Sequence, residues 1–239
     1  MTGFEYVGSE LLMFREAINW KRYWSGVILP FLGMRVLDVG AGIGATAQAF
    51  AKHECSRWIE LEPDPVQARE IVSLRDRGEL PARCEVLVGT SRDLRAHDRF
   101  DTVLYIDVLE HIEDDRAELT RVLDHVDAGG HVVILAPADS FLFTDFDTSI
   151  GHFRRYDRRS LSALLPAGCD MMSCRYLDSA GMLASLANRL LLKQSMPSAG
   201  QIRFWDRVLV RCSLVLDRLT FGCIGKTVVC VYRKRDGVV

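Results

Sequence analysis

The sequence has few of the features that mark secreted, membrane-spanning or metal-binding proteins. Its seven cysteines are an odd number without a CxxC pair, so neither a disulfide framework nor a zinc site is expected, and no bound metal is predicted. The first ten residues are acidic rather than basic, unlike a signal peptide. No uninterrupted apolar run reaches the roughly 20 residues of a transmembrane helix. These absences predict a cytoplasmic protein with no stable membrane insertion.

The sequence also lacks an excess of charge of either sign. The formal net charge of −2 at pH 7 gives no general affinity for nucleic acid. The 239 residues contain no internal repeat and no low-complexity segment. Hydrophobic residues make up 49% and charged residues 26%, as in an ordinary globular protein. The length suits a single domain over residues 1–239 with a substantial core, whereas the oligomeric state stays open.

A glycine-rich turn is the most informative feature that is present. Residues 36–47 read VLDVGAGIGATA, in which an apolar run ends in an acid, Asp38. Three glycines follow at alternate positions: Gly40, Gly42 and Gly44. Glycine permits the positive φ angles and the close approach of a ligand that a binding turn requires. The helix that follows presents free N–H groups to whatever lies in the turn.

Two acids distinguish between the ligands that such a turn binds. Gly40, Gly42 and Ala45 satisfy the dinucleotide fingerprint G-x-G-x-x-G/A, which leaves a nicotinamide or flavin cofactor open. A carboxylate at Asp38 would repel a diphosphate, whereas it suits a cation such as S-adenosylmethionine. Glu62 ends the next apolar run, about 20 positions after Gly40, where an acid meets ribose hydroxyls. We therefore expect S-adenosylmethionine, with its methionine ammonium near Asp38 and its ribose at Glu62.

Strand and helix patterns alternate along the chain. Strands are expected near 34–39, 57–62, 84–88, 100–106, 130–136, 171–177 and 226–233. Helices are expected near 10–25, 44–54, 64–76 and 113–126. This order predicts an α/β fold with a doubly wound, Rossmann-like and mainly parallel sheet, covered by helices on both faces.

The chain resembles the class I S-adenosylmethionine-dependent methyltransferases. Besides the glycine turn and Glu62, the resemblance rests on FDTVLYIDVLEHIEDD, from Phe100 to Asp115, and on the strand from Gly129 to Ala138. The segment IGHFRRYDRRSL, residues 150–161, is similar to a loop of a bacterial subgroup of small methyltransferases. Members of that subgroup often have tyrosine where Phe153 stands.

The resemblance extends from about Asn19 to Lys234 and carries expectations about fold and activity. It implies a seven-stranded sheet with an antiparallel last strand, a helical insertion or lid at 179–225 before that strand, and an N-terminal helical cap at 1–33. It implies methyl transfer to a small-molecule acceptor, and we favour oxygen as the acceptor atom. The alternatives are an N- or C-methyltransferase, a protein or nucleic-acid methyltransferase, and a non-catalytic cofactor-binding regulatory domain.

Further cofactor contacts are expected in two loops. Related enzymes often have an acid directly after the glycine that stands here as Gly89, to accept a hydrogen bond from the adenine amino group. This chain has Thr90 instead, so either Thr90 or Ser91 makes the contact or Asp93 supplies the acid. The resemblance also places Asp107, directly after the fourth strand, near the methionine part of the cofactor.

Two histidines are candidates for a general base. A hydroxyl acceptor must lose its proton, and the unperturbed pKa of histidine is about 6.5. His152 lies on the long connection at 137–157, whereas His111 lies four residues after Asp107. The alternative is that each histidine only holds its loop through hydrogen bonds. Glu110 is expected to have a structural or cofactor-positioning role.

Three polar residues after His152 are candidates for binding the acceptor: Arg154, Arg155 and Tyr156. Arginine forks onto a carboxylate or phosphate, which would suit an anionic acceptor. The alternative is that the arginines pair with a nearby aspartate: Asp145, Asp147 or Asp157.

The helix after the break at 195–200 has a predicted apolar face. That face comprises Trp205, Val208, Leu209, Cys212, Val215, Leu216 and Leu219. Three interpretations remain open: the face completes the core, covers the substrate, or lies on a membrane surface or a second subunit. The acids Asp206 and Asp217 dilute the basic character of the helix and disfavour the membrane.

Overall fold

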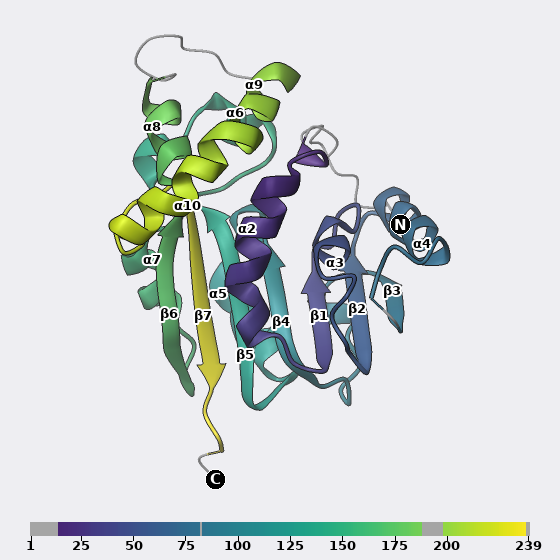
Figure 1. Ribbon diagram of the computed structural model, residues 1–239. Coiled ribbons are helices and arrows are strands. Elements are labelled where there is room, and N and C mark those ends of the chain that lie inside the picture. Colours follow the sequence, from purple (N-terminus) through teal and green to yellow (C-terminus); the bar gives the residue numbers. More distant parts are fainter. Residues whose placement is uncertain (1–13, 82, 188–197, 238–239) are drawn as a thin grey trace.

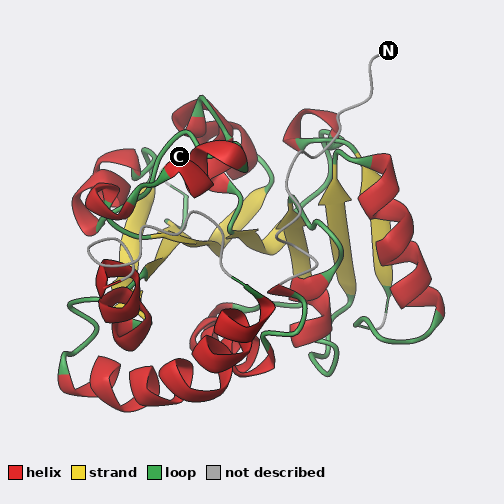
Figure 2. Ribbon diagram, turned by 90° about the horizontal axis from the view of Figure 1, so that it is seen from above, coloured by secondary structure: helices red, strands yellow, loops and turns green. Residues whose placement is uncertain are grey.

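The computed structural model describes residues 14–81, 83–187 and 198–237. Its centre is a seven-stranded sheet with the strand order β3-β2-β1-β4-β5-β7-β6. Helices cover both faces of the sheet (Figures 1 and 2). The predicted N-terminal helix begins partly before residue 14, and that part lies outside the described residues. The break predicted at 195–200 likewise falls mostly outside them.

All seven strands lie where the sequence predicts them. Their bounds are β1 Arg35–Val39, β2 Arg57–Glu62, β3 Cys84–Val88, β4 Phe100–Ile106, β5 Val126–Pro137, β6 Cys169–Leu177 and β7 Thr227–Lys234. Strands β1 to β5 are mutually parallel, and β7 pairs antiparallel with both β5 and β6. The doubly wound α/β fold with an antiparallel last strand is confirmed.

The helices occupy the connections between these strands. Their bounds are α2 Ile18–Ile28, α3 Ala45–Ala49, α4 Pro65–Asp76, α5 Asp115–Leu123, α6 Asp145–Ser149, α7 Arg158–Leu164, α8 Ser179–Ala187, α9 Ala199–Phe204 and α10 Val210–Leu219. A π-helical turn, Trp205–Leu209, joins α9 to α10. No helix within the described ranges has both the length and the apolar character to cross a bilayer.

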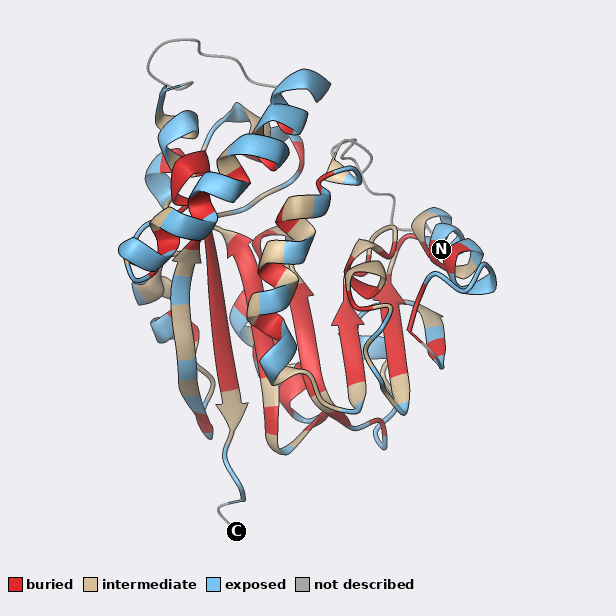
Figure 3. Cartoon of the chain, viewed as in Figure 1, coloured by how far each residue is buried: buried red, intermediate tan, exposed pale blue. Residues whose placement is uncertain are grey.

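The sheet is buried on both faces, as Figure 3 shows for its central strands. Successive side chains of a strand point to opposite faces, so Val36 and Leu37 of β1 belong to different cores. One core packs the sheet against α5 and α7, and the other packs it against α2, α3, α4 and α10. This arrangement explains the nearly continuous apolar runs that the strands have in the sequence.

The apolar face predicted for the α9–α10 segment does not complete the core over most of its length. Four of its residues are exposed: Val208, Cys212, Val215 and Leu219. The buried positions include three polar residues: Asp206, Ser213 and Asp217.

The N-termini of α2 and α8 explain why these polar residues are buried while neighbouring aliphatic residues are exposed. Asp206 accepts a hydrogen bond from the Trp20 amide at 2.8 Å, in the first turn of α2, which has no side-chain cap of its own. Asp217 accepts hydrogen bonds from the amides of Asp178 at 2.8 Å and Ser179 at 3.0 Å, at the start of α8. Amides at a helix start need acceptors and favour negative charge. The carboxylates therefore turn inward, and the neighbouring aliphatic side chains turn outward.

Candidate functional site

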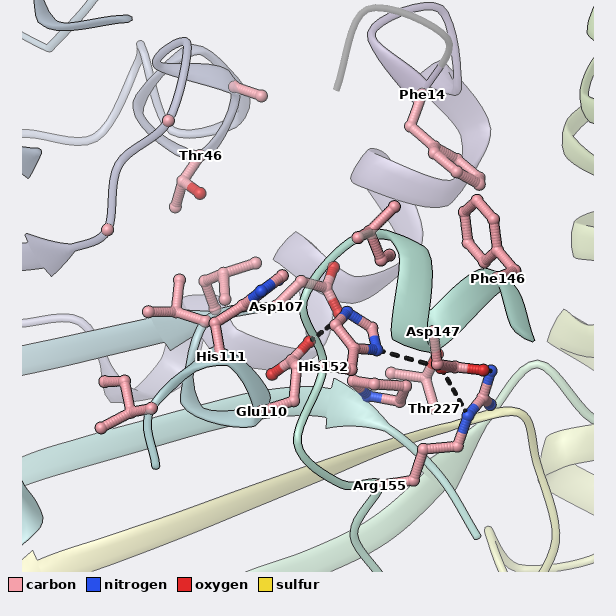
Figure 4. A pocket seen from close by; sticks show the side chains of 18 of the residues that line it. Phe14, Thr46, Asp107, Glu110, His111, Phe146, Asp147, His152, Arg155 and Thr227 are labelled. Carbon is pink, nitrogen blue, oxygen red and sulfur yellow. Dashed lines mark hydrogen bonds and ion pairs between the residues drawn. The ribbon is translucent and has the colours of Figure 1, made fainter. Parts of the chain in front are cut away.

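A cavity of about 1510 Å³ lies where the carboxyl ends of β1, β2 and β4 meet the helices above the sheet (Figure 4). The chain connections reverse direction between β1 and β4, which is the place where open α/β sheets bind ligands. Its lining runs from the glycine turn to His152 and Arg155. Ordinary small-molecule pockets occupy roughly 300–1,000 Å³, so this cavity has room for a cofactor and an acceptor together.

The glycine turn forms one end of this cavity. Gly40 has a φ of 66°, and a Cβ added there would lie 2.7 Å from a methyl carbon of Val108. Gly42 has a φ of 59°. Both residues line the cavity, whereas Gly44, the N-cap of α3, lies just outside it. The first two glycines thus face the cavity, and the third starts the helix.

Glu62 fixes the turn against the end of β2. One carboxylate oxygen accepts a hydrogen bond from the Gly42 amide at 2.7 Å, and the other accepts one from the Asp64 amide at 2.8 Å. Burial raises the pKa of Glu62, and these two hydrogen bonds oppose the rise. Glu62 lines the cavity, so its remaining lone pairs are in place for ribose hydroxyls.

Asp38 lies beneath the turn and does not line the cavity. It is 1% exposed and stands opposite Glu60 in the pairing of β1 with β2. Burial raises the pKa of Asp38 to about 7 and raises that of Glu60 well above its usual range. Because the two facing carboxyl groups are buried and would repel each other if both were ionised, we infer that they share a proton. The predicted contact between Asp38 and the cofactor ammonium therefore stays a prediction.

This shared proton predicts a pH-dependent stability. Because the folded-state pKa values are raised, the stabilisation from the proton is complete below about pH 4 and is lost as the pH rises through about 7. A Glu60→Gln amide would donate to ionised Asp38 and still accept from the Trp58 indole, now 2.9 Å away. One pKa unit corresponds to about 1.4 kcal/mol, so we expect Tm to rise by about 2–5 °C at pH 8 and much less at pH 5.

Calorimetric scans at both pH values check this prediction. Glu70→Gln, on the exposed side of α4, is the matched control and should leave Tm unchanged. An equal Tm gain at pH 5 and pH 8 would contradict the shared proton.

The loop for which adenine contacts are predicted lines the cavity with only part of its length. Thr90 and Ser91 line the cavity, whereas Asp93 does not. Asp93 instead accepts hydrogen bonds from the Thr90 amide at 2.8 Å and the Thr90 hydroxyl at 3.0 Å. Its carboxylate is used in capping a short helical turn. The Ser91 hydroxyl donates to Glu118 at 2.7 Å, which leaves Thr90 and Ser91 as the candidates for adenine recognition.

Asp107 stands at the end of β4 in a left-handed backbone conformation, with a φ of 54°. Asp107 is exposed to solvent through the cavity, although protein atoms surround its carboxyl group. Surrounding protein atoms raise the pKa of Asp107 to about 6, and the neighbouring Lys226 and Arg155 limit the rise. Asp107 lies near His152 in the cavity (Figure 4).

His152 is held in a fixed orientation by Asp147 (Figure 4). Its Nδ1 lies 2.9 Å from the buried Asp147 carboxylate, which also accepts hydrogen bonds from Arg155 Nε at 2.9 Å and Nη2 at 3.0 Å. The hydrogen bonds from His152 and Arg155 depress the pKa of Asp147 against the effect of burial. An ionised Asp147 accepts from Nδ1–H, so the basic lone pair of His152 is at Nε2, on the cavity side.

Glu110 and His111 adjoin His152. Glu110 Oε1 lies 3.9 Å from His152 Nε2, and neither side-chain oxygen of Glu110 has a hydrogen-bond partner among the described residues. Burial raises the pKa of Glu110 well above its usual range. Burial also lowers the pKa of His111 to about 4. The ligand-type atoms of the three side chains lie within 4.8 Å of one another, so this group is the candidate for holding a metal ion.

The three residues predicted to bind the acceptor have different surroundings in the structure. Arg155 lines the cavity, but Arg154 and Tyr156 do not. Arg154 forms an ion pair with Asp115 at 2.6 Å, and the Tyr156 hydroxyl donates to the same carboxylate at 2.8 Å. Their predicted contact with an acceptor does not fit these positions, because both side chains hold the loop against the start of α5.

Several cavity residues carry no signal that sequence reasoning used. Lys226, at the start of β7, has a pKa lowered by burial, and its Nζ lies 5.2 Å from the centre of the Trp205 ring. Phe14 and Phe146 also line the cavity and point into it in Figure 4. Neither phenylalanine stands in a sequence pattern that distinguishes it from an ordinary core residue. Only the fold brings the two side chains into one cavity.

The polar groups around the turn fit a cationic cofactor that has no phosphate. Two acids, Glu62 and Asp107, line the cavity beside Gly40 and Gly42. The turn itself, residues 40–44, contains no lysine or arginine. These features suit an ammonium and a sulfonium with a ribose, and they define a doubly wound α/β protein with a site for an adenosyl cofactor.

Comparison with known proteins agrees with this class. A family profile described as a methyltransferase domain matches residues 13–187, more than half of the chain. The chain therefore belongs to the methyltransferase-domain family, and S-adenosylmethionine is its cofactor. A ubiquinone biosynthesis O-methyltransferase of Azorhizobium caulinodans is 29% identical over 106 residues, which are 44% of this chain and 41% of that protein. The match thus spans less than half of that relative.

Solved structures share the fold at low sequence identity. The [4+2]-cyclase SpnF has a TM-score of 0.63 at 18% identity, with 90% of this chain and 81% of that chain covered. The N-methyltransferase NodS of Bradyrhizobium japonicum, in complex with S-adenosylhomocysteine, has a TM-score of 0.58 at 13% identity, with 93% and 87% covered. At these identities the likeness shows the fold and leaves the acceptor to be argued from the site.

Proposed function

We propose that this protein transfers a methyl group from S-adenosylmethionine to a hydroxyl oxygen of a small-molecule acceptor. The observation that carries the proposal is the single cavity that joins the Gly40–Gly42 turn to the Asp147-held His152. When bound, the cofactor supplies a methyl group on a good leaving group. A relative whose name specifies O-methylation supports oxygen as the acceptor atom.

His152 Nε2 takes the proton of the acceptor hydroxyl in this proposal. Asp147 keeps the imidazole oriented and stabilises the imidazolium that forms. His111, with its lowered pKa, stays neutral near pH 7 and lies against His152, with ring centres 4.6 Å apart. Alignment of acceptor and methyl group provides most of the rate enhancement, because the sulfonium already leaves readily.

Within the helical segment at 179–225, the described residues 179–187 and 198–225 have the role of a lid in this proposal, and within the segment at 1–33 the described residues 14–33 have the role of a cap. Ala184 of α8 and Phe204 of α9 line the cavity above the sheet, and Trp20 of α2 lines it from the N-terminal side. These apolar walls exclude water from the place of transfer. An amine, carbon or protein acceptor has less support, because the name of the similar relative specifies oxygen, and the net charge of −2 disfavours nucleic acid.

A metal-assisted form of the same reaction is the second candidate. The specific observation is Glu110, which is 0% exposed and has no hydrogen-bond partner for its carboxylate oxygens among the described residues. Glu110, His111 and His152 would then hold a divalent cation that binds the acceptor oxygen and favours its ionisation.

Glu62 tests the cofactor assignment. Removal of a charge-assisted hydrogen bond costs roughly 1.5–3 kcal/mol, so Glu62→Ala should weaken S-adenosylmethionine binding about ten- to a hundredfold by titration calorimetry. Glu62→Gln keeps one acceptor for the turn and should lose less. Glu85→Ala, at the exposed face of β3, is the control. Unchanged affinity in Glu62→Ala would rule out the ribose contact.

A panel of labelled transfer assays tests the acceptor class. Hydroxyl, amine and carbon acceptors of similar size are incubated with methyl-labelled S-adenosylmethionine, and labelled product and S-adenosylhomocysteine are measured together. Product from the hydroxyl series supports the proposal. Cofactor binding without S-adenosylhomocysteine formation across the whole panel would favour a regulatory domain.

A further inference from the structure

The outer face of the α9–α10 segment combines an apolar stripe with a basic stripe. The apolar stripe consists of Phe204, Val208, Cys212, Val215 and Leu219. The basic stripe consists of Arg203, Arg207, Arg211 and Arg218. Both sets are exposed and recur at steps of three, four or seven residues, so the two stripes run side by side along the helix. Val215 is 59% and Leu219 69% exposed.

The acids of this segment do not offset the arginines at the surface. Asp206 and Asp217 are the only acidic residues between 199 and 224, and they are 4% and 5% exposed because they cap α2 and α8. The four guanidinium groups have no hydrogen bond or ion pair to another described residue. The outer face, shown in pale blue along α10 in Figure 3, thus carries arginines without an ion pair to a described residue beside aliphatic surface. Glu16 is near Arg203 and Arg207, whereas Arg211 and Arg218 lie farther along the helix.

We propose that this face docks the protein on the surface of an anionic phospholipid bilayer. Arginine pairs with lipid phosphates, and an aliphatic stripe beside the arginines enters the boundary between headgroups and acyl chains. Two copies of the face would place arginines against arginines, which disfavours self-association. A nucleic acid would leave the aliphatic stripe exposed to water. The chemistry therefore fits an anionic lipid surface better than either alternative.

The position of the cavity agrees with this docking mode. Phe204 belongs to the apolar stripe and also lines the cavity, together with Gln201 of α9 and Ala184 of α8. If the outer face docks on a bilayer, this edge of the cavity lies close to the lipid headgroups. If the proposed methyl transfer holds, its acceptor would be an amphiphile that reaches the cavity from the bilayer. The docking itself does not depend on that reaction.

Vesicle flotation of the full chain tests the docking. We expect the protein to float with vesicles of equal parts phosphatidylglycerol and phosphatidylcholine, to float less at high salt, and to stay behind with phosphatidylcholine alone. Each arginine near an anionic surface contributes about fivefold in affinity, so Arg207→Ser combined with Arg211→Ser should weaken binding roughly 25-fold. Val215→Ser combined with Leu219→Ser should weaken it severalfold.

The matched control is Arg69→Ser combined with Arg75→Ser on α4, which lies at the opposite end of the sheet (Figure 1). It should float like the wild type. Calorimetric binding of S-adenosylhomocysteine, expected to be unchanged in all these variants, separates loss of docking from misfolding. Equal weakening by the two arginine pairs or equal flotation with neutral vesicles overturns the proposal. So does a dimer in sedimentation velocity that Val215→Ser with Leu219→Ser dissociates, or equally tight binding to duplex DNA.

Discussion

The Gly42→Val variant is expected to bind no measurable S-adenosylmethionine. Gly42 has a φ of 59°, and a left-handed backbone costs an L-residue roughly 1–2 kcal/mol, with β-branched side chains among the least tolerant. The added isopropyl group would also project from a residue that lines the cavity. The Gly42 amide donates to Glu62 at 2.7 Å, so any relaxation of the turn would release the proposed ribose-binding acid as well.

A thermal shift with S-adenosylhomocysteine measures this loss. Gly78→Val is the matched control, because Gly78 has a φ of 71° and an added Cβ there would meet no atom within 4 Å. It lies after the end of α4, so it should show similar backbone strain while it retains the ligand-induced shift. A normal shift in Gly42→Val would mean that the cofactor does not occupy the turn.

The His152→Ala variant is expected to lower kcat by about 10²–10⁴-fold, the usual contribution of a general base. Cofactor affinity should change little, because the glycine turn and Glu62 remain intact. His152→Asn keeps a donor for Asp147 at the place of Nδ1 but has no basic nitrogen. It should therefore retain the thermal stability of the wild type and lose the same activity. His97→Ala, at an exposed loop position, is the control.

A parallel fall in thermal stability and cofactor affinity in both His152 variants would instead indicate a structural clamp. The chelator EDTA separates the metal-assisted reaction from base catalysis. A wild-type rate that EDTA abolishes and added divalent cation restores would assign His152 to a metal site with Glu110 and His111. A rate that EDTA leaves unchanged is the outcome expected for base catalysis.

The strands and the cofactor end of the site are the parts that sequence reasoning predicted well. Strand positions were predictable because both faces of a parallel sheet are buried, which produces continuous apolar runs such as those of β1 and β4. The glycine turn is equally local, because positive φ angles at Gly40 and Gly42 restrict the residue type at each position. Glu62 could be found by its distance along the chain from the turn.

The acceptor end was predicted less well, because its residues are paired across the chain. Sequence alone left open whether Arg154 and Arg155 face an acceptor or an aspartate. The structure pairs Arg155 with Asp147 and Arg154 with Asp115. Lys226 and Phe14 enter the cavity from opposite ends of the sequence, and neither has a local pattern that marks it.

The sequence by itself determined the fold class and the cofactor, because strand burial, the glycine turn and its acids are encoded over short stretches. Only the tertiary structure decided which polar groups share a proton, which histidine has an orienting partner, and which side of α10 faces solvent. The helical pattern of α10 favoured burial of its aliphatic residues. The uncapped amides at the starts of α2 and α8 drew Asp206 and Asp217 inward instead, because a buried N–H without an acceptor costs more than an exposed aliphatic side chain.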